Sequence, residues 1–284
     1  MRNRVARKII LLIAIAVFLY SGVMMLMYYA EMRDGMELAE SVAGKVVSVA
    51  NEPDETGALD DGVMTETAAA PARPEETLQA EETEPVESIP AVTEKVCPIE
   101  VDFDALLQEN KDVVAWIYCP GTPINYPVVQ AEDNDYYIHR LLDGKTNSSG
   151  TLFMDYRNSA DLSDWNSVIY GHNMKNGTMF GYLPHYKEQS YFEEHTEMFL
   201  LTPEQNYAIE VMAGFVTTSD DELYNAFCPD EAGKDALVNE WLNASDFVSN
   251  VYPELEDRII TLSTCSYEFD NARYVLVGVL RKTR

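Results

Sequence analysis

Residues 258–280 read RIITLSTCSYEFDNARYVLVGVL, two apolar, β-branched runs joined by a polar segment. The runs Arg258–Cys265 and Arg273–Leu280 predict two strands of an antiparallel hairpin, connected by residues 266–272. In such a hairpin Cys265 ends one strand and Arg273 begins the next, so the two side chains face each other at one end of the sheet. A guanidinium in that place favours a thiolate or donates hydrogen bonds to an oxyanion.

Further short apolar runs precede the hairpin and are separated by Gly, Pro, Asn and Asp. They lie at 124–129, 150–154, 167–170, 198–201 and 207–216. Short strands with turn residues between them predict a closed barrel or a sandwich. Helical spacing appears near Phe103 and again at 230–243, where Leu237 and Trp241 share a face. The predicted fold class is mainly β, with a few helices.

The first thirty residues predict a membrane anchor. Four basic residues within positions 1–8 precede an uncharged apolar run, Ile9–Ala30. As a helix this run is about 33 Å long, enough to cross a hydrocarbon core of about 30 Å. A cleaved signal peptide has a shorter apolar region, of roughly 7–15 residues. We therefore expect an uncleaved, single-pass anchor in the plasma membrane, with the basic end in the cytoplasm and the rest of the chain outside.

The acidity of the chain is concentrated after this anchor. The 284 residues have a formal net charge of −28, and residues 31–100 hold 18 acidic and 4 basic residues, a net of −14. We expect 31–98 to be a stalk and tether, helical to about Ala50 and then extended, because 51–97 is rich in Glu, Pro and Thr. Residues 99–284 are the expected globular domain. So negative a chain is not expected to bind nucleic acid.

A cysteine nucleophile at Cys265 needs a basic or cationic neighbour, because a free thiol with a pKa of about 8.5 is only a few per cent thiolate at pH 7. His172 is the leading candidate, since it follows the predicted strand 168–170 through Gly171. The other histidines, His139, His185 and His195, lie in a predicted short helix, a loop and a charged stretch. The residues alone leave two interpretations open: a catalytic set, or a buried cysteine with a structural histidine and a solvated arginine.

Short motifs around these residues resemble those of the sortase family. Residues 261–265, TLSTC, resemble the T-L-x-T-C signature around the sortase nucleophile, and residues 170–175, YGHNMK, resemble the histidine segment. Arg273 opens the strand after the cysteine, where the sortase arginine lies. Similarity to class B sortases extends over 125–130, 152–157 and 178–181, so that the resemblance spans about 101–280.

This resemblance implies a closed sortase-type β-barrel. It also implies an N-terminal helical extension, matched here by Phe103–Trp116, and a helix-containing insertion before the nucleophile strand. The implied activity is cysteine transpeptidation, in which Cys265 cleaves the sorting signal of another exported protein after Thr and forms a thioester. An amine of a peptidoglycan precursor or a pilin then resolves it. In this resemblance His172 is the acid and base, Arg273 stabilises the oxyanion or positions the substrate, and the signal is of the N-P-x-T-N or S-P-x-T-G kind.

Two substrate-binding residues are expected besides these. Ser263 lies two residues before Cys265 and therefore on the same face of its strand, as a groove residue or as a solvated serine. Tyr224 lies in the insertion that forms a groove wall in class B sortases, and packing is the alternative role. Cys119 and Cys228 are either a disulfide or two free structural cysteines. No cofactor or metal is expected, because there is no C-x-x-C and the acidic runs 132–135 and 220–222 lack EF-hand spacing.

Other enzyme classes fit less well. Papain-like proteases place the cysteine before the histidine, and caspases carry Q-A-C-x-G, neither of which is found here. A serine hydrolase is disfavoured because G-x-S-x-G is absent. The alternative outside enzymes is a membrane-anchored extracellular β-domain that binds a partner without catalysis. Such a module has no need for a reactive thiol at Cys265.

Overall fold

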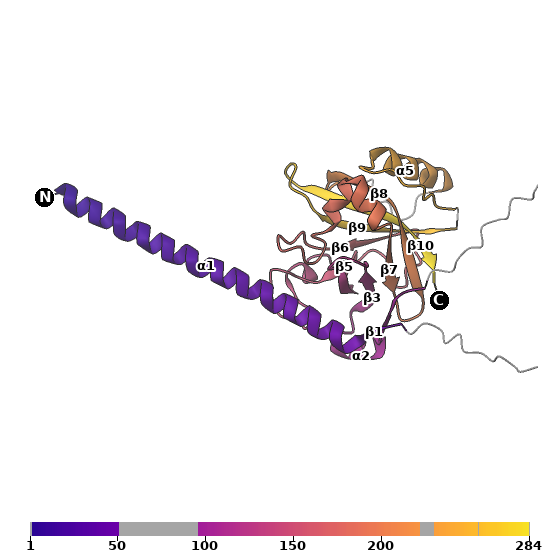
Figure 1. Cartoon of the computed structure of the whole chain (residues 1–284), viewed down its shortest axis with the longest axis horizontal. Coiled ribbons are helices and arrows are strands. Elements are labelled where there is room, and N and C mark those ends of the chain that lie inside the picture. Colours follow the sequence, from indigo (N-terminus) through magenta and orange to yellow (C-terminus); the bar gives the residue numbers. More distant parts are fainter. Residues whose placement is uncertain (1, 51–95, 222–229, 255, 284) are drawn as a thin grey trace, which may run out of the picture.

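The body of the molecule is a closed eight-stranded β-barrel (Figure 1). The computed structural model describes residues 2–50, 96–221, 230–254 and 256–283. Around the barrel the strands follow the order β10-β8-β7-β3-β4-β5-β6-β9. Their bounds are β3 Val113–Tyr118, β4 Asn125–Val129, β5 Leu152–Met154, β6 Asn166–Tyr170, β7 Glu197–Leu201, β8 Asn206–Thr218, β9 Arg258–Cys265 and β10 Ala272–Lys282. The mainly β fold class is confirmed, and closure leaves none of these strands as an open sheet edge.

Two of the barrel pairings decide where the pocket forms. β9 and β10 are antiparallel, as predicted from the hairpin. β6 and β9 are parallel neighbours although 87 residues lie between Tyr170, the last residue of β6, and Arg258, the first of β9. The carboxyl ends of β6 and β9 therefore lie beside the amino end of β10, at one end of the barrel.

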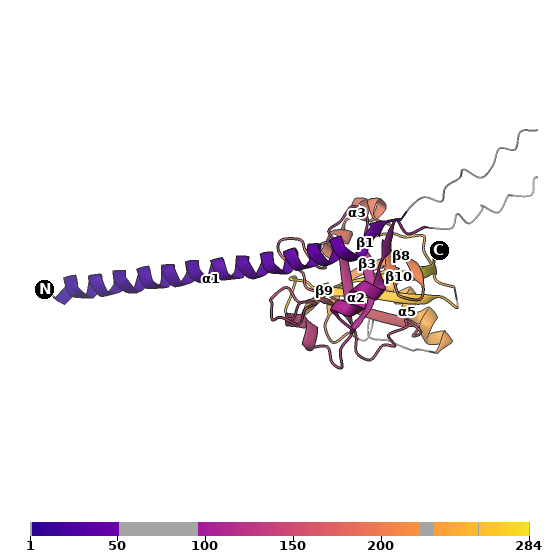
Figure 2. The ribbon, with the colours of Figure 1, turned by 90° about the horizontal axis from the view of Figure 1, so that it is seen from below.

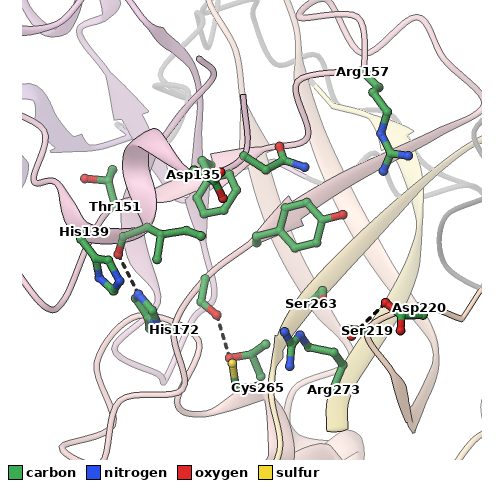
Figure 3. A pocket seen from close by; sticks show the side chains of 16 residues that line it. Asp135, His139, Thr151, Arg157, His172, Ser219, Asp220, Ser263, Cys265 and Arg273 are labelled. Carbon is green, nitrogen blue, oxygen red and sulfur yellow. Dashed lines mark hydrogen bonds between the residues drawn. The ribbon is translucent and has the colours of Figure 1, made fainter. Parts of the chain in front are cut away.

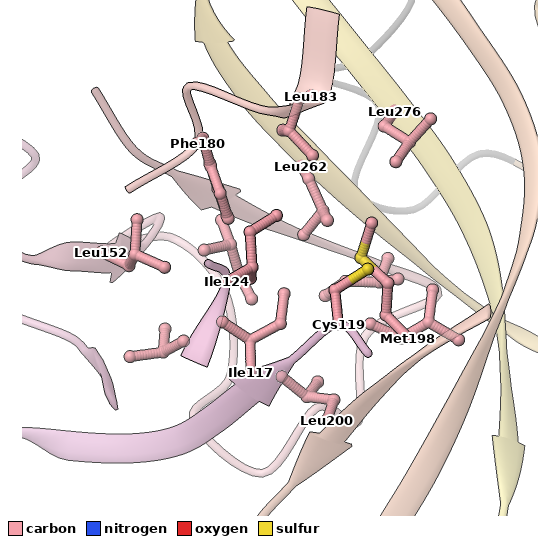
Figure 4. Close-up of a cluster of buried hydrophobic side chains, with 14 of the residues drawn as sticks. Ile117, Cys119, Ile124, Leu152, Phe180, Leu183, Met198, Leu200, Leu262 and Leu276 are labelled. Carbon is pink, nitrogen blue, oxygen red and sulfur yellow. The ribbon is translucent and has the colours of Figure 1, made fainter. Parts of the chain in front are cut away.

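The barrel interior is filled by alternate side chains of these strands. Ile260 and Leu262 of β9 point into it and pack in the same cluster as Phe180 and Leu276 (Figure 4). Because successive side chains of a strand point to opposite faces, Ser263 and Cys265 lie on the outer face of the barrel wall.

Helices cover parts of the outside. α5, Glu231–Ala244, confirms the helix expected at 230–243; its N-cap Asp230 accepts a hydrogen bond from the Gly233 amide, and its Trp241 stacks on Trp165. Shorter helices are η1 Tyr136–His139, η2 Leu183–Lys187 and α3 Gln189–Glu194. The helical extension expected at 103–116 is only half correct. α2 covers Phe103–Glu109, and Val113–Trp116 already belong to β3, because their β-branched and aromatic side chains complete the barrel wall.

α1, Arg2–Val46, is one unbroken helix of 45 residues. It is long and apolar enough to cross a membrane, and the apolar side chains from Ile9 to Tyr29 are exposed. Its C-terminal third lies against the barrel, with Met32, Val42 and Val46 buried (Figures 1 and 2). The chain then forms β1, Val47–Val49, which pairs antiparallel with β2, Ile99–Val101.

The first part of the expected stalk is helical, as predicted, because α1 continues to Val46. It does not stand apart from the globular domain, however, since Met32, Val42 and Val46 are buried against it. The reason is an apolar and small-residue stripe at alternating spacings of three and four, made by Met32, Gly35, Ala39, Val42 and Val46, which the barrel covers. The rest of the expected tether, 51–95, lies outside the described residues.

Candidate active site

Cys265 and Arg273 are directly opposite each other. They are register partners in the β9–β10 ladder, and both side chains are half-buried. Directly opposed residues have Cβ atoms about 4.5–5.5 Å apart. The Arg273 guanidinium also donates a hydrogen bond of 3.0 Å to the Ala272 carbonyl. The hairpin prediction thus placed these two side chains correctly.

The segment that carries His172 is fastened to the end of β9 by three hydrogen bonds. The Gly171 amide donates to the Ser263 carbonyl (3.1 Å), and the Thr264 hydroxyl donates to the Gly171 carbonyl (2.8 Å). The Asn173 side-chain amide donates to the Cys265 carbonyl (2.9 Å). These bonds bring the residue after β6 to the cysteine, although 93 positions separate His172 from Cys265 in the sequence.

Two neighbours determine the state of the His172 ring (Figure 3). Nε2 lies 2.7 Å from the Ile138 carbonyl, which only accepts, so Nε2 carries a proton and Nδ1 is the nitrogen left to exchange one. The His139 ring stacks on His172 with 5.7 Å between centroids and 17° between planes. Burial lowers the pKa of His172, the Ile138 carbonyl partly opposes this, and the charge of His139 lowers the pKa further.

The three side chains line one pocket of about 1070 Å³. Its walls also include His139 and Ser263, with the exposed Asp220 at the end of β8. A thiol, an imidazole and a guanidinium are the groups that covalent acyl transfer requires: a nucleophile, a proton carrier and a cation for a developing oxyanion. The structure therefore brings together the three residues that the sequence singled out.

The family model described as the sortase domain matches residues 117–281, which is more than half of the chain and includes Cys265, His172 and Arg273. The chain belongs to the sortase family. It is 36% identical over 173 residues to Sortase B of Listeria monocytogenes, covering 60% of this chain and 70% of that protein. It is 32% identical over 182 residues to Sortase B of Staphylococcus aureus, covering 63% and 75%.

Solved structures agree with this assignment. The crystal structure of Staphylococcus aureus Sortase B matches with a TM-score of 0.61 and 31% identity, over 64% of this chain and 87% of that one. Clostridium perfringens Sortase B matches with a TM-score of 0.60 and 31% identity, over 63% of this chain and 100% of that one. A Bacillus anthracis sortase B complex matches with a TM-score of 0.59 and 33% identity, over 64% of this chain and 85% of that one. These similarities place the chain among the class B sortase enzymes.

Ser263 lies in the wall of this sortase's pocket, on the face expected for it. Its side chain is 1% exposed, and its hydroxyl has no hydrogen-bond partner among the described residues. A buried polar group without a partner is unfavourable, by about 1–3 kcal/mol, unless a bound group satisfies it. Tyr224, the other expected substrate residue, lies outside the described residues.

A buried carboxylate, which we did not predict as part of the site, supports the pocket wall from behind. The Asp155 side chain is fully buried and accepts hydrogen bonds from Arg157, Asn134 and the Tyr170 hydroxyl. Burial raises the pKa of Asp155, but these hydrogen bonds outweigh it, and the pKa is lowered. Asp155 thus holds Tyr170, two residues before His172, in place. The spacing of Asp155 and Arg157 within the LFMDYR segment was the available signal.

The remaining cysteines of the sortase are structural where they are described. Cys119 is buried in the barrel core without a disulfide, and burial raises the pKa of its thiol. Cys228 lies outside the described residues, so the structure answers the expected choice between a disulfide and two free cysteines only for Cys119, which is free. Among the described residues, no group of three or more His, Cys, Asp or Glu could hold a metal ion.

Proposed function

We propose that this chain is a membrane-anchored transpeptidase in which Cys265 is the nucleophile. The observation that carries the proposal is the pairing of Cys265 with Arg273 while Asn173, next to His172, is bound to the Cys265 carbonyl. The Cys265 thiolate attacks the carbonyl carbon of the threonine in a sorting signal. The C–N bond breaks, the leaving amine takes a proton from His172, and a thioester remains.

The second half of the reaction reverses these roles. An incoming amine, from a peptidoglycan precursor or a pilin, gives a proton to His172 and attacks the thioester. The C–S bond breaks and the thiolate returns. Arg273 stabilises the oxyanion in both steps, and acid–base help from a histidine typically contributes about 10²–10⁴-fold. Ser263 is proposed to donate its hydroxyl to the substrate backbone. Tyr224, which lies outside the described residues, is proposed as a second substrate-binding residue.

The proposed location rests on α1. Ile9–Ala30 crosses the plasma membrane once, the basic end stays in the cytoplasm, and the barrel lies outside the cell. Its partners are exported proteins that carry a sorting signal of the N-P-x-T-N or S-P-x-T-G kind. The support is the exposed apolar surface of α1 together with the basic residues before it.

The test is peptide cleavage by the full chain in detergent. Fluorogenic peptides with both kinds of signal are offered with and without an amine acceptor. Cleavage after threonine is expected, with loss of nearly all activity in Cys265→Ala and a loss of about 10²–10³-fold in Arg273→Ala. Cys97→Ala, which removes a buried thiol that does not line the pocket, is the matched control and keeps its activity.

The same variants separate this proposal from a binding module. A methanethiosulfonate reagent should label Cys265 in the folded chain and stop cleavage. If Cys265 stays unlabelled and no peptide is cleaved, a binding module without catalysis is the better reading. Cleavage that persists in Cys265→Ala would contradict the assigned nucleophile.

A further inference from the structure

The part of α1 directly after its apolar run contacts two loops of the barrel. The Asn147 side-chain amide donates to the Glu31 carbonyl at 2.8 Å. The Asn176 side-chain amide lies 3.4 Å from the Met36 sulfur. Between them, a Cβ on Gly35 would lie 3.0 Å from the Ser149 hydroxyl. The loops 143–149 and 173–178 are thus packed against residues 31–36.

Both loops are hydrogen-bonded to residues of the pocket. The Asn147 backbone amide donates to the carbonyl of His139, the residue stacked on His172. Asn173, at the start of the other loop, donates to the Cys265 carbonyl. The end of the barrel that carries the pocket is therefore the end that meets α1 next to its apolar run.

The rise of the helix gives the distance between these contacts and the end of the apolar run. From Ala30 to Met36 is six residues, and an α-helix rises 1.5 Å per residue, so the contacts lie within about 9 Å of the end of the apolar run. The helix continues without a break through this region, to Val46. An anchor that is continuous with a docked helix leaves the barrel no flexible joint at the membrane surface.

A third loop lies on the same side. Figure 1 shows the yellow connection between β9 and β10 projecting from the barrel on the side where the N-terminal half of α1 leaves it, and Figure 2 agrees. It carries Tyr267 and Phe269, whose side chains are 73% and 48% exposed. Aromatic side chains are typical of the headgroup region of a bilayer.

The loops at this end carry little net charge. The loops 143–149, 173–178 and 266–271 hold two lysines and three acidic residues, a net of −1. Asp143 is ion-paired with Lys145, and Glu268 with Lys187. Such a surface has little net charge for anionic lipid to repel.

We propose that the pocket end of the barrel lies on the outer surface of the lipid bilayer, with the β9–β10 loop in the headgroup layer. This rests on the proposed anchoring through Ile9–Ala30. Docked α1 holds the barrel in this orientation, and Tyr267 and Phe269 add contacts to lipid. The enzyme then acts on substrates presented close to the bilayer rather than at the far side of a tether.

The test measures short-range quenching in the full chain, reconstituted into vesicles of phosphatidylcholine and phosphatidylglycerol with nitroxide-labelled headgroups. Phe269→Trp places a fluorophore on the β9–β10 loop. The matched control is Tyr252→Trp, at a 50% exposed residue in the segment that enters β9 at the end opposite Cys265. The chain's three tryptophans, Trp116, Trp165 and Trp241, are buried and give a constant background.

The nitroxide should remove most of the emission that Phe269→Trp adds and little of the emission that Tyr252→Trp adds. Inserting about twelve Gly and Ser residues between Ala30 and Glu31, a flexible coil of roughly 20 Å, should restore the emission of Phe269→Trp. Lys175→Trp, on the loop next to Asn176, gives the same readout if Phe269→Trp does not fold.

Two failures are distinguishable. If the chain floats with the vesicles but both positions are equally quenched or equally unquenched, the orientation is refuted and the anchoring stands. If the chain does not float with the vesicles, the proposed anchoring fails, and this inference fails with it.

Discussion

At the scale of single residues, His139 is a neighbour of the proposed catalytic histidine that the sequence did not predict. Sequence patterns gave it no role, because it ends a short helix and its side chain is exposed. In the folded chain it stacks on His172, and its charge lowers the pKa of that ring. A positive charge on His139 disfavours a second positive charge on the adjacent ring of His172.

His139→Gln is expected to raise the pKa of His172. The variant removes a nearby positive charge but not the burial of the ring, so the pKa rises only part of the way to about 6.5. At a pH just above the pKa, more of His172 is then protonated and able to serve as an acid. Titration of the histidine ring protons by NMR measures this directly, since the chain has four histidines.

His185→Gln is the control for this titration. His185 lies in η2 and stacks on Tyr182, not on His172. It should leave the pKa of His172 unchanged. The expectation is wrong if His139→Gln and His185→Gln shift that pKa equally, or if neither does.

At the scale of elements, the parallel pairing of β6 with β9 brings His172 to Cys265. Gly171 joins the end of β6 to His172, in a place with no room for a side chain. A Cβ there would lie 2.3 Å from Leu152 Cδ2 and 2.7 Å from Phe180 Cδ2, and both side chains are fully buried. Neither neighbour can move freely in a packed core, so the backbone of the Gly171 segment must shift.

Gly171→Ala is therefore expected to lower both stability and activity. Overpacking of this kind typically destabilises by about 1–3 kcal/mol, and a displaced His172 lowers kcat/KM. Urea unfolding and peptide cleavage measure the two effects. Gly44→Ala is the matched control: its Cβ meets nothing within 4 Å, so in helix α1 it should stabilise by about 0.5–1 kcal/mol. Equal stability changes for the two variants would refute the packing argument.

Sequence patterns predicted the strands that carry Cys265 and Arg273, but they did not predict the residues that support the pocket from other segments. The hairpin of β9 and β10 is local, with six residues between its strands, so alternation and turn residues were enough to place Cys265 opposite Arg273. Asp155, Ile138 and Asn173 reach the site through contacts between distant segments. A single sequence carries no periodic signal for such contacts.

At the scale of the whole molecule, α1 is both a candidate anchor and a part of the barrel's packing. Val42 is 4% exposed against the barrel, whereas Val49, a few residues on in β1, is 80% exposed. In a soluble chain that begins at Glu31, Val42→Asp should destabilise the fold by about 2–4 kcal/mol, because it buries an unpaired charge. Val49→Asp should change stability by no more than about 0.5 kcal/mol.

Urea unfolding of the two variants checks this. A cooperative loss of stability in Val42→Asp alone shows that α1 and the barrel unfold together. Similar small effects at both positions would mean that the docked half of α1 adds nothing to the stability of the domain.

The amino-acid sequence by itself determined the mainly β class, the hairpin that pairs Cys265 with Arg273, the helix α5 and the apolar run of α1. Each of these follows from a periodic pattern or a turn within a few tens of residues. Only the tertiary structure decided the parallel pairing that brings in His172, the stacking of His139 and the docking of residues 31–49 on the barrel. These depend on which distant surfaces close the barrel and bury its core, and the free energy of that burial belongs to the pairs of surfaces rather than to either segment alone.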